Sequence, residues 1–180
     1  MGKRVLADKK IKLTILTTKP ANEADPTVAE LNAGIEACKK VLSDGFRFSP
    51  TASGTASAKA LCGSNEEAFT DSNAELAFTL WRYYLEAGGI DPADDELFQA
   101  VMTRGTTLWA YMRKTDKPAT DAWVATEEIR IGARFTVDYL RDPSAEAYIS
   151  YEVPTAVEDF WTFRAVAAGA LRLTADPLAV

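Results

Sequence analysis

The chain has 180 residues, of which 47% are hydrophobic, a net charge of −6, and no histidine. This length suits one domain with a substantial core. The negative charge disfavours a general nucleic-acid-binding surface, because affinity for phosphate backbones comes mainly from clustered Lys and Arg. The lack of histidine removes the commonest general base and the commonest metal ligand, which disfavours hydrolases of the Ser-His type and zinc enzymes.

The spacing of the cysteines and glycines disfavours a bound metal or nucleotide cofactor. Cys38 and Cys62 lack CxxC spacing, so neither a zinc site nor a redox motif is predicted, and their disulfide status is left open. No Gly-rich phosphate loop joins a predicted strand to a helix, so no cofactor is expected. The chain has no hydrophobic signal segment and no apolar run of membrane-spanning length, which predicts synthesis in a reducing cytoplasm and no membrane partner.

The N-terminal segment is basic, with a net charge of +4 over twelve residues. Its charged residues are five cations and one anion: Lys3, Arg4, Lys9, Lys10, Lys12 and Asp8. Residues 1–9 are predicted to form an arm, and the alternation that begins at Ile11 predicts a strand over 10–17. The arm is either solvated or docked on an acidic patch of a neighbouring copy. A matching acidic run contains Glu86, Asp91, Asp94, Asp95 and Glu96.

The next segments predict short elements followed by an irregular region. Asp25 and Pro26 begin a helical turn at about 26–33, and a strand is expected over 35–42. Residues 45–73 are rich in Ser, Ala, Thr and Gly, which predicts a long loop or an irregular hairpin. Three aromatic rings are spaced through this region and belong to Phe46, Phe48 and Phe69. They either anchor the loop on another subunit or lie in a disordered segment.

Two aromatic strands flank one predicted helix. The helix is expected at about 92–103, with Asp91 as its N-cap and Gly105 as its stop. The strand before it, 76–86, and the strand after it carry apolar side chains on both faces. In the second strand one face presents Trp109 and Tyr111. Either a second copy of the chain covers these faces, or they are the two sides of an ordinary sandwich core.

The C-terminal third predicts a final set of strands. Residues 129–139 alternate strictly, with Tyr139 counted among the inward residues. A turn at Asp142 and Pro143 leads to a strand over 148–153, which is expected to form a hairpin with the strand before it. A last strand contains Phe160, Trp161 and Phe163. Residues 166–180 are weakly patterned and are interpreted as a mobile or partner-dependent tail.

Paired acids are the remaining candidates for catalysis. They are Glu66 with Glu67, Asp94 with Asp95, and Glu127 with Glu128. Adjacent residues point to opposite faces of a strand, and acids at a helix start stabilise the helix dipole, so ordinary solvation or capping explains each pair. We therefore expect no catalytic residue, no metal site and no enzyme activity. The elements together predict a mainly β (α+β) fold: one domain over 10–165, an antiparallel β-sandwich or partial barrel with one packed α-helix.

Five segments in order resemble the tail tube protein (major tail protein) of long-tailed, non-contractile bacteriophages. They are VLADKKIKLTILTTKPAN from Val5, TVAELNAGIEA from Thr27, FRFSPTAS from Phe46, FQAV from Phe98 and GTTLWAY from Gly105. The similarity is to phages of actinobacteria. It implies a structural virion protein whose subunits close into hexameric rings, and rings that stack into the hollow tube through which phage DNA passes without specific binding. It also implies tape measure and tail terminator proteins as partners, and a place in the virion tail after assembly in the host cytoplasm.

The resemblance gives the loop and the basic arm a role, because loops and termini commonly bridge stacked rings in this family. The candidate intersubunit contacts are Lys9, Lys10, Phe46, Phe48, Phe69, Asp94, Asp95, Trp109 and Tyr111. Two other interpretations stay open. One is a ring-forming tail terminator or other tail component, and the other is a monomeric cytoplasmic β-sandwich binding module.

Overall fold

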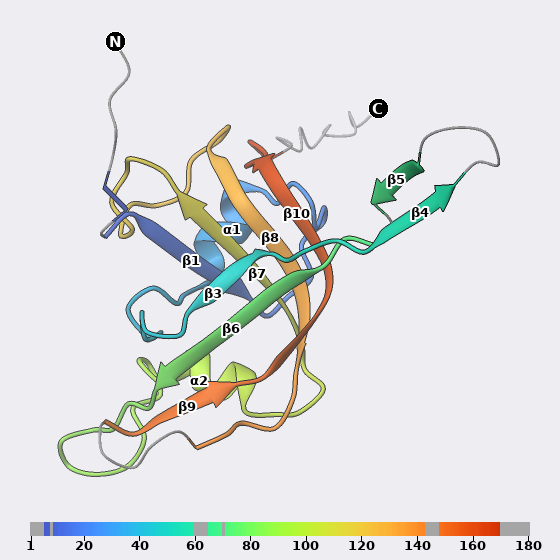
Figure 1. Ribbon diagram of the computed structural model, residues 1–180. Helices are drawn as coiled ribbons and strands as arrows, with labels where there is room; N and C mark the ends of the chain where they lie inside the picture. The colour runs from blue at the N-terminus through green and yellow to red at the C-terminus, as the bar shows by residue number, and fades with distance from the viewer. Residues whose placement is uncertain (1–5, 8, 60–64, 70, 143–147, 170–180) are drawn as a thin grey trace, which may run out of the picture.

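The computed structural model describes residues 6–7, 9–59, 65–69, 71–142 and 148–169. This part of the chain contains ten strands and two short helices (Figure 1). In chain order they are β1 (Ile11–Leu16), α1 (Val28–Ala33), β2 (Ile35–Glu36), β3 (Arg47–Pro50), β4 (Thr55–Lys59), β5 (Asn65–Phe69), β6 (Ala74–Trp81), α2 (Glu96–Val101), β7 (Thr107–Lys114), β8 (Glu128–Val137), β9 (Ser150–Val153) and β10 (Thr155–Ala165).

Two antiparallel sheets form the body, and a two-stranded hairpin lies outside it. The larger sheet has the order β10-β8-β7-β1-β2, and the smaller sheet has the order β3-β6-β9 and crosses in front of the larger one in Figure 1. Strands β4 and β5 pair only with each other. The predicted mainly β, antiparallel sandwich with a packed helix is confirmed.

The main core lies between the two sheets and is closed at one end by α2. Phe78 of β6 meets Phe135 of β8 edge to face, with ring centroids 6.4 Å apart. Helix α2 adds Leu97, Phe98 and Val101, all buried in the same cluster. The one-, three- and four-residue spacing of Leu97, Phe98, Val101 and Met102 predicts an apolar stripe, and the first three of these residues cover the sandwich while Met102 is 54% exposed.

A second core lies on the opposite face of the larger sheet. Helix α1 and the loop after β7 cover this face, where Leu31, Trp109, Tyr111 and Trp123 are buried together. The Trp123 indole nitrogen donates to the Thr14 hydroxyl at 2.9 Å, which fixes the loop on β1. Strand β7 is thus buried on both faces within one subunit, and no second copy is needed to cover it.

Helix α1 begins later than Asp25 and Pro26 suggested. Its N-cap is Thr27, whose hydroxyl accepts from the Glu30 backbone while the Glu30 carboxylate accepts from the Thr27 backbone at 2.8 Å. This reciprocal capping box satisfies two amides that the helix itself leaves unpaired.

The main helix is also shorter than the predicted 92–103. The Asp91 carboxylate accepts from the backbone amides of Ala93 and Asp94, which holds residues 92–94 in a separate turn. Asp95 then becomes the residue before the helix, and its carboxylate faces Arg82 instead of capping the first turn. The prediction of Asp91 as N-cap was wrong by one turn, because this aspartate caps the turn that precedes α2.

Two predicted strands are cut short by turns. The strand expected over 35–42 is reduced to β2, because the amides of Lys40 and Val41 both donate to Ala37 and fold the chain back. The strand expected over 76–86 ends at Trp81, and its outward face is half-buried where two-sided burial was predicted. Beyond it, the Tyr83 amide donates to Asp95 in place of a strand partner.

The predicted hairpin between 129–139 and 148–153 is wrong as a pairing of strands. The chain folds back in an isolated antiparallel bridge between Arg141 and Glu152, beyond the end of β8. Strand β9 pairs with β6 in the smaller sheet, the chain crosses between sheets at Pro154, and β10 returns to pair with β8. The predicted inward position of Tyr139 is also wrong, since this side chain is 70% exposed beyond the end of β8. Past β10, Val166 is buried and Ala167 bonds to Pro26, so the body continues to Ala167.

Candidate assembly surfaces

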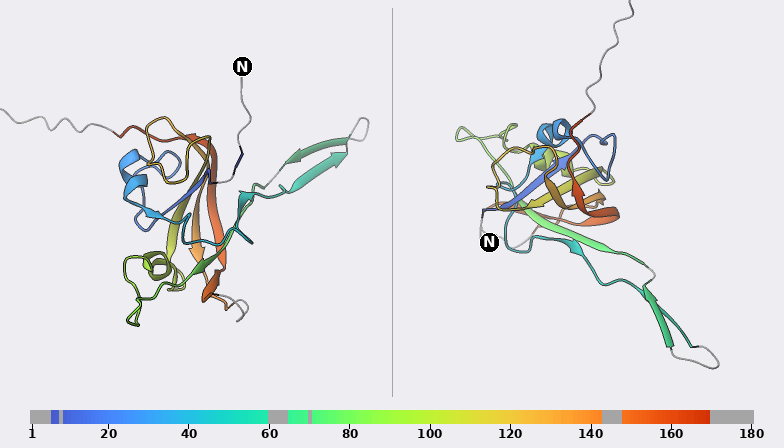
Figure 2. Two further views of the ribbon diagram at one scale, coloured as in Figure 1. Left: turned by 90° about the vertical axis from the view of Figure 1, so that its left-hand side faces the viewer. Right: turned by 90° about the horizontal axis from the view of Figure 1, so that it is seen from above.

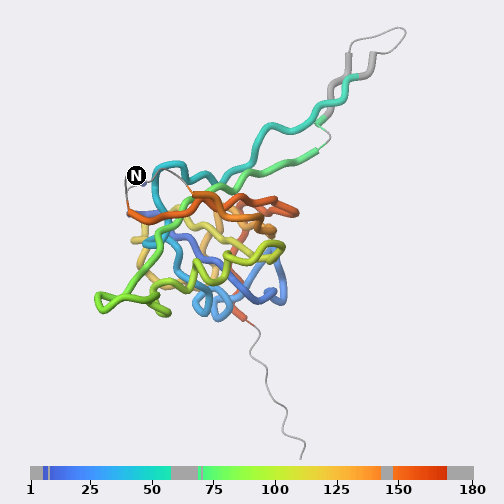
Figure 3. The backbone as a smooth tube through the Cα atoms, turned by 90° about the horizontal axis from the view of Figure 1, so that it is seen from below, coloured from blue at the N-terminus to red at the C-terminus, as the bar shows by residue number. Residues whose placement is uncertain are grey.

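The hairpin β4–β5 projects away from the body (Figures 2 and 3). Its strands pair from Thr55 with Phe69 to Lys59 with Asn65. Region 45–73 therefore contains β3 and this hairpin, so the irregular-hairpin interpretation holds and the long loop does not. The segment 60–64 and the side chain of Cys62 lie outside the described residues.

The hairpin has little to hold it folded by itself. Thr55, Ala56, Ser57 and Phe69 are all exposed, and Phe69 is 83% exposed. An isolated two-stranded hairpin is marginally stable in water, because it has no third strand and no core to pack against. Small side chains add little apolar area but permit close approach of another backbone. The hairpin is consequently a surface suited to cover by a second chain.

Strand β10 provides a long open edge. It forms one margin of the larger sheet with eleven residues, whereas β2 at the other margin has two. Its ladder with β8 is interrupted at Glu158, whose carboxylate bonds to the Thr136 hydroxyl and to Arg134 at 2.9 Å. Unpaired strand edges recruit further strands, and bulges of this kind restrict where pairing occurs.

Phe163, near the end of β10, is unusual in its backbone and its exposure. It has φ of +52°, a conformation disfavoured for a bulky residue, and its ring is 64% exposed. The Arg130 guanidinium lies over this ring at 4.4 Å from the centroid. An exposed aromatic held by a cation on an open edge is the kind of group enriched at interfaces.

A network of charged side chains lies at the face of the larger sheet that carries Tyr111. Glu23 pairs with Lys19 at 2.9 Å and with Arg134 at 3.4 Å, and Arg134 continues the network to β10. The Lys19 ammonium, together with Arg134, lowers the pKa of Glu23 against the opposing effect of burial. Tyr111 donates to the Glu23 carbonyl at 2.8 Å, and burial raises the pKa of this hydroxyl.

A buried ion pair anchors the loop that covers Trp123. Arg113 is fully buried and donates to Glu127 at 3.0 Å and to backbone carbonyls of Pro118 and Ala122. Lys117 adds a second cation at 3.2 Å from Glu127. Buried charges persist only when paired and hydrogen-bonded, so this cluster fixes the loop geometry.

The nine predicted intersubunit residues fall into two groups. Lys9, Phe69 and Asp94 are exposed, while Lys10 is half-buried and donates to the Asp116 carbonyl. The other five, buried or half-buried within the subunit, are Phe46, Phe48, Asp95, Trp109 and Tyr111. Their part in assembly stays a prediction. Sequence reasoning missed the Arg82 pair with Asp95 and the β10 edge, because neither has a local motif.

The paired acids do not form an active site in the described residues. Asp95 is paired with the half-buried Arg82 and Glu127 with the buried Arg113, whereas Asp94 and Glu128 are exposed. Within the described ranges, no group of three or more potential ligands could hold a metal ion. Neither described helix has the length and apolar character of a membrane span. Burial and the neighbouring Glu36 raise the pKa of the Cys38 thiol to about 11, so it is a poor nucleophile at neutral pH.

Comparison with known proteins supplies one match. The family model described as phage tail tube protein matches residues 1–170 of the chain. Neither the curated proteins nor the solved structures contain a significant match. The family match covers both sheets, the projecting hairpin and the β10 edge.

Proposed function

This chain belongs to the phage tail tube protein family, and from that premise we propose that six copies close into a ring and that stacked rings form the hollow tube of the phage tail. As a member of this family the chain is a structural component of the virion tail that assembles with itself into a tube. The number of subunits in the ring and the passage of DNA through the lumen belong to the proposal.

The observation that carries the proposal is the uncovered hairpin. A two-stranded element made of small residues and placed outside both cores is stabilised only when another chain packs on it. A projecting arm that meets a different surface on the next copy makes a heterologous contact. Such contacts generate rings or open filaments, depending on the rotation between copies.

We assign the contacts between neighbouring subunits of one ring to the outer edge of β10. In the described part of the chain no strand pairs with its outer side, although the Thr155 hydroxyl at its start donates to the Leu76 carbonyl of β6. Closure of a ring removes such a free edge. The carboxylate of Glu158 interrupts the edge, so pairing with a neighbour is restricted to parts of the strand. Phe163 and Arg130 add an aromatic contact on the same margin.

The net charge supports a lumen that does not retain DNA. Six chains at −6 each carry −36 per ring. Acidic residues on the inner wall repel phosphate and leave DNA free to slide. The proposal includes assembly in the host cytoplasm, contacts with tape measure and tail terminator proteins, and no catalytic role for the chain.

The test is electron microscopy of the purified protein at rising concentration, together with a variant in which residues 55–69 are replaced by two glycines. Thr55 and Phe69 are paired, so this excision joins chain ends that already lie together. We expect hollow striated tubes with sixfold symmetry from the unmodified chain, and folded monomers or single rings from the variant. A chain that stays monomeric at every concentration would overturn the proposal, and rings without tubes from the unmodified chain would favour a tail terminator.

A further inference from the structure

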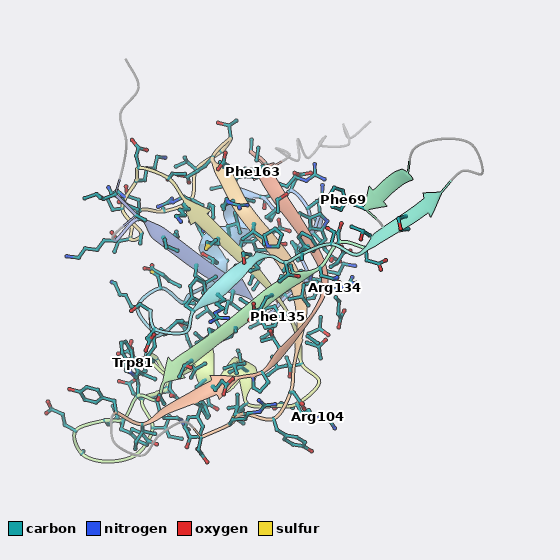
Figure 4. The ribbon with its side chains drawn as sticks, viewed as in Figure 1. Phe69, Trp81, Arg104, Arg134, Phe135 and Phe163 are labelled. Carbon is teal, nitrogen blue, oxygen red and sulfur yellow. The ribbon has the colours of Figure 1, made fainter. Side chains whose placement is uncertain are left out.

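An open aromatic groove lies at the end of β6, away from the hairpin. Trp81, Arg82, Tyr83, Tyr84 and Tyr148 line it, and its volume is about 470 Å³. Figure 4 places Trp81 at the end of β6 that lies opposite Phe69. Tyr148 is 84% exposed and Tyr84 is 49% exposed, so the groove presents aromatic surface to solvent. Within the residues that the structure describes, no segment covers these two rings.

The base of the groove is held in place by backbone bonds and one buried ion pair. The Arg82 amide donates to the Ile149 carbonyl at 3.0 Å, and Tyr84 bridges Ile90 across a short turn. The Arg82 guanidinium pairs with Asp95 at 3.2 Å and lies 3.9 Å from the Phe98 ring centroid. The groove is therefore built on residues that also belong to the main core.

Three acidic residues, Glu86, Asp91 and Asp94, lie in the turns beside the groove. One exposed cation, Lys39, also lies beside it, since the Tyr83 hydroxyl donates to the Lys39 carbonyl. Asp91 donates its amide to the Tyr83 carbonyl, and Glu86 lies in the turn between Tyr84 and Ile90. Asp94 lies in the same turn as Asp91, whose carboxylate accepts from the Asp94 amide. Burial, and then the negative charge of Asp94, raises the pKa of Tyr83. Asp95 and Glu96 are neutralised by Arg82 and Lys40. No ion pair is found for the other three acids, Glu86, Asp91 and Asp94, in the part of the chain that the structure describes.

We propose that this groove receives the basic N-terminal segment, residues 1–7, of a second copy of the chain. The inference rests on the proposed self-assembly. The segment contains Lys3 and Arg4 followed by Val5 and Leu6, a combination of cations and apolar side chains that matches aromatic faces bordered by acids. Leu6 is 85% exposed in the subunit. Seven extended residues reach up to about 25 Å, enough to cross to a neighbour.

Charge and position exclude the other occupants that the chain offers. The hairpin contains Lys59, Glu66 and Glu67, so its net charge of −1 is repelled by the three acids beside the groove. The segment of the same subunit is also disfavoured, because β1 begins at the upper end of the body in Figure 1 and β6 ends at the lower end. The contact therefore joins two copies.

The test is a charge-reversal cycle on the full chain. One variant carries Lys3→Glu and Arg4→Glu, a second carries Glu86→Lys and Asp94→Lys, and a third carries all four changes. We expect each double variant to raise the concentration needed for tube formation by about tenfold or more, and the fourfold variant to restore it. Sedimentation and electron microscopy measure assembly, and circular dichroism confirms that each variant is folded.

Two variants that each remove one exposed aromatic ring distinguish an effect of the groove from a general effect of surface change. Tyr148→Ala should impair assembly, whereas Tyr139→Ala, which removes a ring exposed at 70% outside the groove, should not. If the unmodified chain forms tubes and the charge reversals leave assembly unchanged, the inference is overturned while the proposed function stands. Loss of assembly in Tyr148→Ala alone would assign the groove to the hairpin and also overturn it. Absence of tubes from the unmodified chain is instead a failure of the proposed function.

Discussion

Strand β7 and the hairpin β4–β5 show opposite relations between composition and burial. Strand β7 has apolar residues on both faces, and both faces are covered within the subunit by the smaller sheet on one side and by α1 with the Trp123 loop on the other. Apart from Phe69, strands β4 and β5 consist of small and polar residues, and neither core covers them. A strand that is apolar on both faces is thus internal, and the element left for partners is among the least apolar.

This difference shows that an apolar pattern indicates that a strand is buried. The pattern does not say whether the covering residues belong to the same subunit or to another copy. A ring or tube subunit must remain soluble before it assembles, so a projecting arm made of Ala, Ser and Thr limits exposed apolar area. Its contacts are expected to come from backbone pairing and close approach. The following four predictions test this division between a self-sufficient body and a partner-dependent hairpin.

Phe135→Ala should have the largest effect on the body. The ring is fully buried and packs edge to face on Phe78. Its removal leaves a cavity between the sheets and should lower the free energy of unfolding by about 3–5 kcal/mol. Urea denaturation of the monomer measures this change. A loss below about 1 kcal/mol would contradict a core that is complete within one subunit.

Asp95→Asn should produce a smaller loss of stability. The carboxylate is buried, pairs with Arg82 and accepts from the Tyr83 amide and the Gln99 side chain. Asparagine can keep only part of this set and carries no charge, so we expect a loss of about 1.5–3 kcal/mol. Asp94→Asn is the matched control, because Asp94 is exposed, and thermal unfolding of both variants makes the comparison.

Glu30→Ala should cost about 1 kcal/mol at neutral pH by removing the capping box of α1. Burial alone would raise the pKa of Glu30, but hydrogen bonds from the backbones of Ala21 and Thr27 outweigh it and lower the pKa. The ionised carboxylate is the stabilising form, so its contribution is full above pH 4.5 and is lost as pH falls through the lower folded pKa. Melting curves of both proteins should therefore converge in acid.

Phe69→Ala should have the smallest effect on the monomer. The ring is 83% exposed, so the free energy of unfolding should change by no more than about 0.5 kcal/mol. Assembly should nevertheless be weakened, because the lost ring belongs to the surface assigned to a second copy. Parallel measurements of unfolding and sedimentation test both halves. Equal loss of stability in Phe69→Ala and Phe135→Ala would remove the distinction between body and hairpin.

Elements with a strict local pattern were predictable from the sequence. The alternation from Ile11 and the aromatic run through Trp109 predicted β1 and β7. Of the predicted stripe of Leu97, Phe98, Val101 and Met102, the first three form the buried face of α2, whereas Met102 is 54% exposed after the helix ends. These patterns are local consequences of strand and helix geometry, so one sequence suffices to find them.

Pairing and termination were less predictable, because they depend on residues distant in sequence. The end of β6 is set by an Asp95 carboxylate that takes the Tyr83 amide, and β9 pairs across the sandwich with β6 instead of with its sequence neighbour. The aromatic groove was missed for the same reason, since Tyr148 reaches it from another segment. The acidic run around Asp94 was visible, but its relation to the groove was not.

Strand β6 runs without interruption between the base of the hairpin and the groove, so it is the direct covalent connection between these two surfaces. Its first half, Ala74–Ala77, pairs with β3, and its second half, Phe78–Trp81, pairs with β9. Tension applied between hairpin and groove acts along this strand, at right angles to its ladder hydrogen bonds. Those bonds must then break together, because no single bond is loaded first. A subunit held by neighbours at both of these ends would therefore resist extension through the covalent backbone of β6.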